Sequence, residues 1–188
     1  MTKLSVVLLV AGLGLFSLNA NAALYTFSQT GFEENAFISG SFEGVDSNDD
    51  GILQGGFLAS VQEISAFSMT FSGNSIVPVF SHAYSDLTYL GFRLTGNATL
   101  GEGNPEGLAT RLLLPGYVAP SSGYTYNSGV YGNGQNGAGI VNWNADSNGF
   151  IYTESPNLVS VNAVPVPGTV WLFGSAVAGF LGLKRRKA

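Results

Sequence analysis

Short stretches in which apolar and polar residues alternate run through the middle of the chain. Residues 64–72 are the clearest case, because Phe67, Met69 and Phe71 alternate with serine and threonine. A period of two residues places the apolar side chains on one face of a β-strand and the polar ones on the other. The same pattern predicts further strands at 24–28, 36–44, 76–80, 87–94, 108–114, 123–130, 149–153 and 158–163.

Turn-forming pairs separate these expected strands, among them Gly73-Asn74 and Pro115-Gly116. No window in the middle of the chain keeps a helical period for long. Many short strands joined by frequent turns predict an all-β fold, an antiparallel β-sandwich or jelly roll. Residues 131–139 are rich in glycine and asparagine, so we expect a mobile surface loop there.

The first 22 residues predict a signal peptide. Lys3 provides a basic start, residues 4–18 are apolar, and Ala20 and Ala22 form a small-x-small cleavage site. We expect the Sec translocase to export the chain and signal peptidase to cut it before Ala23. The alternative is a retained N-terminal membrane anchor, against which the cleavage site argues.

The last 25 residues have the three parts of a sorting tail. Proline lacks a backbone donor and fixes φ, so the tail should begin as an extended, accessible segment. An uncharged run at 169–183 follows. Trp171 lies near its outward end, where an indole ring suits the membrane–water interface. The residues that define the first and last parts are Val164, Pro165, Val166, Pro167, Lys184, Arg185, Arg186 and Lys187.

The length of the apolar run allows a transmembrane helix. At about 1.5 Å per residue the run reaches roughly 22 Å, and counting from Val164 it reaches roughly 30 Å, the thickness of a bilayer core. The basic end would then stay in the cytoplasm. From these properties alone, a plain C-terminal membrane anchor is the alternative.

The order of these features resembles the PEP-CTERM sorting domain. The chain carries Val164 to Pro167 where the name-giving form has Pro-Glu-Pro, and a glycine-rich helix and a basic end follow. The resemblance covers about 25 of the 188 residues and concerns sorting. It implies a Gram-negative bacterium that makes exopolysaccharide, and a membrane protease, exosortase, that recognises and processes the tail.

The segment between the two ends, residues 23–163, is expected to form one exported domain. It holds two basic residues against all 12 acidic residues of the chain, a net charge of −10. Such a charge repels nucleic acid and anionic polymers, so nucleic-acid binding is not expected. The chain has no cysteine, so its stability outside the cytoplasm has to come from packing or bound ions.

One internal motif has the beginning of a calcium-binding loop. Asp46, Asn48 and Asp50 occupy alternate positions, as in the pattern D-x-[DN]-x-[DN]-G, and Gly51 permits the sharp turn. Their side-chain oxygens and the carbonyl oxygen of Ile52 are ligands that calcium prefers. The motif therefore makes these residues a candidate calcium site.

The second half of that pattern is missing. Phe57 stands where the twelfth position of the loop should supply a bidentate glutamate, and no helical pattern flanks the loop. Glu63 could close the site only if the chain folds back. The alternative is a polar hairpin turn in which aspartate and asparagine act as turn formers.

The sequence offers little for catalysis. His82 is the only histidine, so an ordinary zinc site is not available, and there is no G-x-S-x-G nucleophile motif. We interpret His82 as an exposed or hydrogen-bonded histidine, and no catalytic residue is assigned. A hydrolase that uses two of the acids stays open as a third class, because 12 acids supply many pairs.

Aromatic residues gather in the second half of the chain among asparagine, serine and glycine. Flat rings of this kind can stack on sugars, which would suit a carbohydrate-binding module. The alternative, which we favour, is the ordinary core and rim of a β-protein. The residues are Tyr117, Tyr124, Tyr126, Tyr131, Trp143 and Tyr152.

Together these features predict a protein without enzymatic activity that passes through the inner membrane to the cell surface or extracellular matrix. We expect a structural or adhesive role in exopolysaccharide or biofilm, with exopolysaccharide as a candidate partner. The alternative is a calcium-dependent carbohydrate-binding module.

Overall fold

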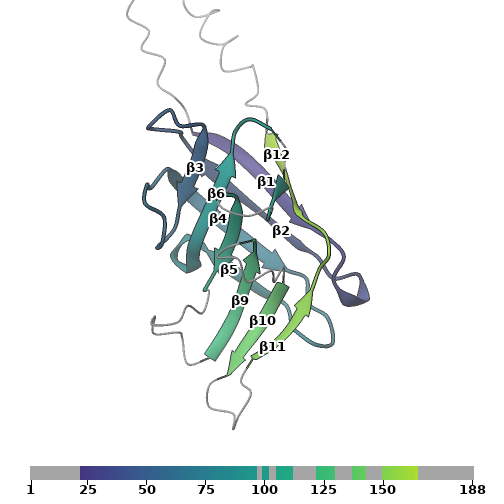
Figure 1. Cartoon of the computed structure of the whole chain (residues 1–188). Helices are drawn as coiled ribbons and strands as arrows, with labels where there is room; N and C mark the ends of the chain where they lie inside the picture. The colour runs from purple at the N-terminus through teal and green to yellow at the C-terminus, as the bar shows by residue number, and fades with distance from the viewer. Residues whose placement is uncertain are drawn as a thin grey trace, which may run out of the picture.

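The computed structural model describes residues 22–96, 99–101, 105–111, 122–129, 137–142 and 150–164, which form two antiparallel sheets. The first sheet has the order β5 (Phe80–Ala83), β4 (Ile64–Phe71), β2 (Ile38–Gly44), β1 (Ala23–Gln29), β12 (Val159–Val164) and β7 (Thr99–Leu100). The second sheet has the order β11 (Phe150–Glu154), β10 (Gly137–Asn142), β9 (Ser122–Ser128), β8 (Gly107–Thr110), β6 (Leu87–Arg93) and β3 (Ile52–Gly55). Two short 3-10 turns, η1 (Glu33–Asn35) and η2 (Tyr84–Asp86), lie between strands (Figure 1).

Aromatic side chains from both sheets fill the core. Phe92 of β6 packs edge-on against Tyr25 of β1 and Phe42 of β2, with ring centroids 5.3 and 5.7 Å apart. Phe80 of β5 stacks on Tyr124 of β9 at 4.9 Å. Because these pairs join the two sheets, the inner faces pack on each other as in a β-sandwich.

A buried polar contact also joins the sheets. The hydroxyl of Tyr126 on β9 donates to Oε1 of Gln29 on β1 at 2.6 Å. Nε2 of Gln29 in turn donates to the carbonyl oxygen of Asn157 at 2.6 Å. Burial raises the pKa of Tyr126, so the phenol stays protonated and keeps its role as a donor.

The predicted all-β fold is confirmed. The alternation in residues 64–72 corresponds to β4, in which Phe67, Met69 and Phe71 are buried. At 87–94 the strand ends at Arg93, and Leu94 is 39 % exposed rather than in the core.

The strand predicted at 76–80 is wrong. The side-chain oxygen of Asn74 accepts the N–H groups of Ile76 and Val77 and turns the chain there, so that β5 begins only at Phe80. Val77 is fully buried, which explains why this segment is apolar without being a strand. Pro78 has no N–H and so cannot donate to a strand ladder.

The loop predicted at 131–139 is wrong at its C-terminal end, because β10 begins at Gly137. A β-carbon on Gly137 would lie 2.6 Å from the carbonyl oxygen of Thr153 on β11. Glycine at this position therefore lets two backbones approach closely, and its presence does not indicate a flexible loop. Residues 131–136 lie outside the described residues.

Candidate functional site at the end of the domain that carries both termini

The first and last strands of the domain pair with each other. β1 and β12 are antiparallel, and Leu24 lies opposite Val164 (Figure 1). Ala23, with which the mature chain is expected to begin, is thus one residue from this pair. The predicted N-terminal cleavage position and the start of the tail therefore lie side by side at one end of the sandwich.

Most of the predicted sorting residues lie outside the described part of the chain. Of the Val-Pro motif, the structure describes Val164, which is the last residue of β12 and is 36 % exposed. Pro165, Val166, Pro167, Trp171 and the basic residues 184–187 are not described, and neither is Ala20. Among the residues that are described, no helix is long and apolar enough to cross a membrane.

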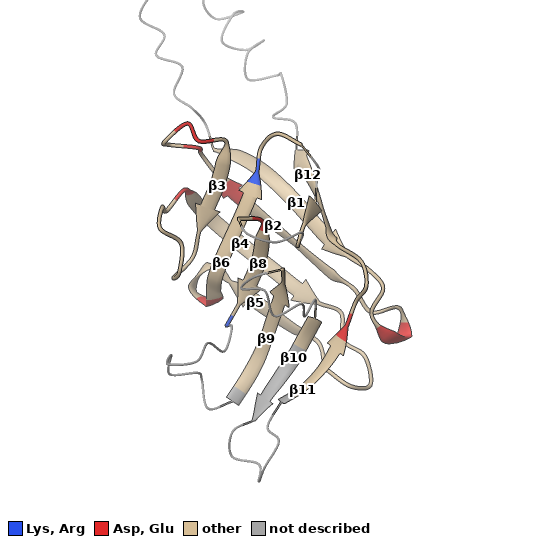
Figure 2. Cartoon of the chain, in the orientation of Figure 1, with Lys and Arg blue, Asp and Glu red and all other residues tan. Residues whose placement is uncertain are grey.

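The candidate calcium loop, residues 45–51, lies at the same end. It follows β2, whose last residue Gly44 is opposite Ala23 of β1, and it leads into β3 of the second sheet. Figure 2 shows the acidic residues of this loop in red beside the start of β3. The loop therefore crosses between the sheets close to both chain ends.

Hydrogen bonds within the loop use the side-chain oxygens of the predicted ligands. Asp46 accepts the backbone N–H groups of Asp50 and Gly51, at 3.2 and 2.8 Å. Asn48 also accepts the N–H of Asp50, at 3.1 Å, and its amide donates to Oδ2 of Asp50 at 3.0 Å. Oδ1 of Asp50 accepts the N–H of Ile52 at 2.8 Å.

These contacts are those of a polar turn built by aspartate and asparagine. Among the described residues, no group of three or more His, Asp and Glu side chains is placed to hold a metal ion. The side-chain oxygens of Asp46, Asn48 and Asp50 accept backbone N–H groups of the loop and so stabilise the turn. Calcium binding stays a prediction.

Glu63 meets the loop, because the chain does fold back after β3. Its side chain is 6 % exposed, and Oε1 accepts the backbone N–H of Ser47 at 2.9 Å and the hydroxyl of Ser47 at 3.1 Å. Oε2 accepts the N–H of Gln54 on β3 at 3.1 Å. Both carboxylate oxygens therefore fix the loop against the next strand.

Replacing Glu63 by glutamine is expected to lower the free energy of unfolding by about 1–3 kcal/mol, because an NH₂ group would face a backbone N–H donor. Chemical denaturation followed by circular dichroism measures this loss. Glu43→Gln on the outer face of β2 is the matched control, expected within about 0.5 kcal/mol of the wild type. Equal losses in both variants would contradict the role assigned to Glu63.

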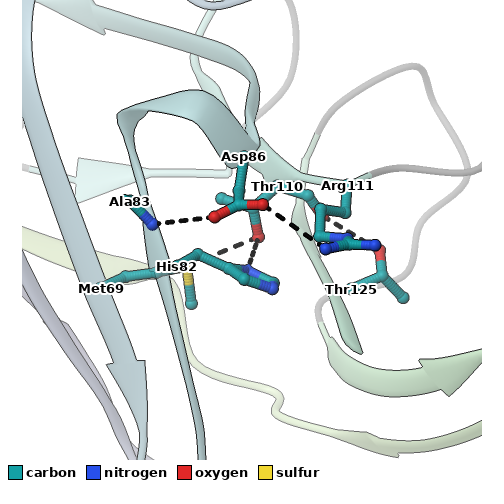
Figure 3. Close-up of polar contacts among 7 residues, drawn as sticks. All are labelled: Met69, His82, Ala83, Asp86, Thr110, Arg111 and Thr125. Carbon is teal, nitrogen blue, oxygen red and sulfur yellow. Dashed lines mark hydrogen bonds and ion pairs between the residues drawn. The ribbon is translucent and has the colours of Figure 1, made fainter. Parts of the chain in front are cut away.

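The histidine is part of a buried polar cluster (Figure 3). His82 on β5 is 6 % exposed, and its Nδ1 lies 2.8 Å from the hydroxyl oxygen of Thr110 on β8. That hydroxyl also donates to the sulfur of Met69, at 3.5 Å. The hydrogen-bonded histidine expected from the sequence is confirmed.

Asp86 has other partners. Its Oδ2 accepts the backbone N–H of Ala83 at 3.1 Å, and its Oδ1 lies 3.6 Å from Nη1 of Arg111. Burial lowers the pKa of His82 to about 4, with nearby Asp86 raising it and Arg111 lowering it further. The imidazole is therefore neutral at pH 7 and connects the two sheets as a structural group.

The low pKa of His82 predicts how stability depends on pH. In the unfolded chain the imidazole has a pKa of 6.5, so on acidification the unfolded state takes up a proton before the folded state does. Above pH 6.5 the imidazole is neutral in both states, so its titration should not change the free energy of unfolding. As the pH is lowered from 6.5 towards 4, the free energy of unfolding should fall.

Chemical denaturation of the wild type and of His82→Gln, each at about pH 7 and about pH 5, measures this change in the free energy of unfolding. The wild type is expected to lose more stability between the two values than the variant does. An equal loss in both proteins would mean that His82 does not cause the pH dependence.

The aromatic residues of the second half divide into core and rim. Tyr126 is fully buried and Tyr124 stacks on Phe80, whereas Tyr152 is 43 % exposed. The core interpretation is thus confirmed for Tyr124 and Tyr126. Tyr117, Tyr131 and Trp143 lie outside the described residues.

The fold and the placement of its ends define an all-β domain whose last strand runs directly into a sorting tail. Residues 163–187 match the PEP-CTERM protein-sorting motif. This motif implies an exported protein that exosortase processes and that is sorted to the cell surface. No curated protein and no solved structure matches the chain.

Proposed function

We propose that the domain is a structural or adhesive component of the cell surface or of the exopolysaccharide matrix. The observation that carries this proposal is the sorting motif, which begins at Ala163, inside β12. Because the domain and the motif are continuous, the sorting step would deliver the whole sandwich. Its destination is then the place where it acts.

A role without catalysis is supported by how the polar side chains are used. His82 is buried against Thr110, and Glu63 and Asp46 accept backbone N–H groups. Asp86 pairs with Arg111. Groups held in this way stabilise the fold and are poorly available to a substrate.

Deletion of the gene in its native bacterium tests the proposal. We expect loss of matrix-associated biomass or of attachment, restored by the wild-type chain and by His82→Gln at neutral pH. Normal matrix and attachment in the deletion strain would overturn the structural role. Loss of complementation with His82→Gln, despite normal amounts of protein, would instead favour an enzyme.

A calcium-dependent carbohydrate-binding module is the second candidate. It is favoured by the order of Asp46, Asn48 and Asp50 in an exposed loop and by the position of Glu63 beside it. Glycan binding that a chelator abolishes and calcium restores would support this function. Binding that is unchanged in chelator would exclude the calcium requirement.

A further inference from the structure

We infer that the outward face of the first sheet binds a neutral polysaccharide. This face is built mainly from serine and threonine, on strands that come from both ends of the domain. One row of directly opposed residues crosses all six strands of the sheet, and every member carries a hydroxyl. The row consists of Ser81, Thr70, Ser39, Ser28, Ser160 and Thr99.

A second row runs parallel to the first, two residues nearer to the chain ends. Its members are Ser68, Ser41, Thr26 and Asn162. We call the two rows the hydroxyl face. Their side chains point outward, because the residues between them on each strand, such as Phe27 and Met69, are buried in the core.

The hydroxyl face carries no charged residue. Among the described residues on the outside of this sheet, the acid is Glu43, which lies beyond the second row towards the chain ends. Figure 2 shows these strands in tan for most of their length. Since the exported segment carries a net charge of −10, a wide uncharged surface on it is a distinct feature.

The centre of the hydroxyl face is hollowed. An open depression of about 580 Å³ is lined by members of both rows, including Thr26, Ser41 and Thr70. Hydroxyl oxygens are already paired there, 3.2 Å apart between Ser41 and Ser68 and 2.8 Å apart between Thr70 and Ser81. Each hydroxyl has one proton and two lone pairs, so a paired hydroxyl can still bond a ligand.

The chemistry of this surface selects among possible occupants. Nucleic acid and anionic lipid would need basic residues, which the hydroxyl face lacks. The centre of a protein interface is usually enriched in aromatic residues, methionine and arginine, and the two rows contain none of these. A neutral polysaccharide instead presents many hydroxyls that both donate and accept hydrogen bonds.

The regular spacing of the rows suits a polymer. Adjacent strands lie about 4.8 Å apart, so the longer row offers hydroxyls at a constant interval across the sheet. An extended glycan can use several of these weak contacts at once. This inference rests on the proposed function, because surface delivery brings the face to matrix polysaccharide, but binding itself can be tested without delivery.

The test uses the full chain, purified in a detergent without a sugar headgroup. Dextran, mannan and hydroxyethylcellulose are immobilised as neutral polymers, with alginate as the anionic control. We expect binding to at least one neutral polymer and none to alginate. The triple variant Thr26→Ala, Ser41→Ala and Ser68→Ala should raise the dissociation constant by about tenfold or more, since each bond contributes modestly.

The control removes exposed hydroxyls elsewhere, with Ser85→Ala and Thr95→Ala, and should bind as the wild type does. Ser41→Lys, which fills the depression while adding charge, is a second variant in case the triple variant does not fold. Its dissociation constant for the neutral polymer should also rise by about tenfold.

Three results would overturn the inference: no binding to any neutral polymer, binding to alginate alone, or equal binding by wild type and Ser41→Lys. Sedimentation of the same samples tests whether a second copy of the chain binds this face instead. Self-association that Ser41→Lys abolishes, without glycan binding by the wild type, would show that a second copy of the chain covers this face. None of these outcomes depends on sorting, so failure here leaves the proposed function standing.

Discussion

Alanine in place of both Pro165 and Pro167 is expected to reduce processing of the sorting tail strongly. A protease binds its substrate as an extended strand, and the two prolines are expected to keep this segment extended. With alanine at both positions the helix predicted at 169–183 could extend towards the domain, and its hydrogen bonds would withdraw the backbone from the enzyme. We expect the processed fraction to fall by about tenfold or more, because a proline in a helix costs about 3 kcal/mol and alanine removes that barrier.

The intact mass of the protein from the surface fraction measures the effect. The wild type should lack residues 1–22 and the tail beyond about Pro165–Pro167, whereas the double variant should keep Trp171 to the end of the chain. The matched control is Val164→Ala with Val166→Ala, which shortens two side chains in the same segment and keeps the prolines. Equal processing of both double variants would show that exosortase does not need the prolines.

Replacement of Phe42 by alanine is expected to cost about 3–5 kcal/mol of stability, as for other buried phenylalanines. The side chain is 1 % exposed, stacks on Tyr25 at 4.9 Å and packs edge-on against Phe92 of the other sheet. Removing the ring leaves a cavity where the two sheets meet. A loss of this size is a large part of the roughly 5–15 kcal/mol that stabilises a typical domain.

Phe57→Ala is the matched control for this experiment, because it deletes the same atoms from a side chain that is 71 % exposed. The backbone N–H of Phe57 donates to the carbonyl oxygen of Leu87, and alanine retains that bond. Chemical denaturation should place the control within about 0.5 kcal/mol of the wild type. If Phe42→Ala were as stable as the control, the assigned core would be wrong.

The alternation of residues predicted the strands that have one face in the core. β4 and β12 could be predicted because each alternates over several residues, and burial of Val159 and Val161 confirms the pattern for β12. The short strands β3 and β7 have four and two residues, too few for a period to be recognised. Pairing with neighbours that are distant in the sequence forms them.

In the candidate calcium loop, too, the local contacts could be predicted from the sequence and the long-range contact could not. The order of Asp46, Asn48, Asp50 and Gly51 predicted a sharp polar turn, because these contacts are local. The sequence left open whether Glu63 reaches the loop. Its contacts with Ser47 and Gln54 exist because β3 returns the chain to the start of β4.

The sequence by itself determined the sorting motif at residues 163–187, because it is a continuous segment that a protease reads in order. The signal peptide predicted at residues 1–22 is a continuous segment of the same kind. The sequence also determined that serine and threonine would alternate with apolar residues along single strands. Only the tertiary structure decided that Ser28, Ser39 and Ser160 would stand in one row. The physical reason is that strand register depends on hydrogen bonds between separate strands, of which β1 and β12 lie more than a hundred residues apart, and local alternation cannot specify that pairing.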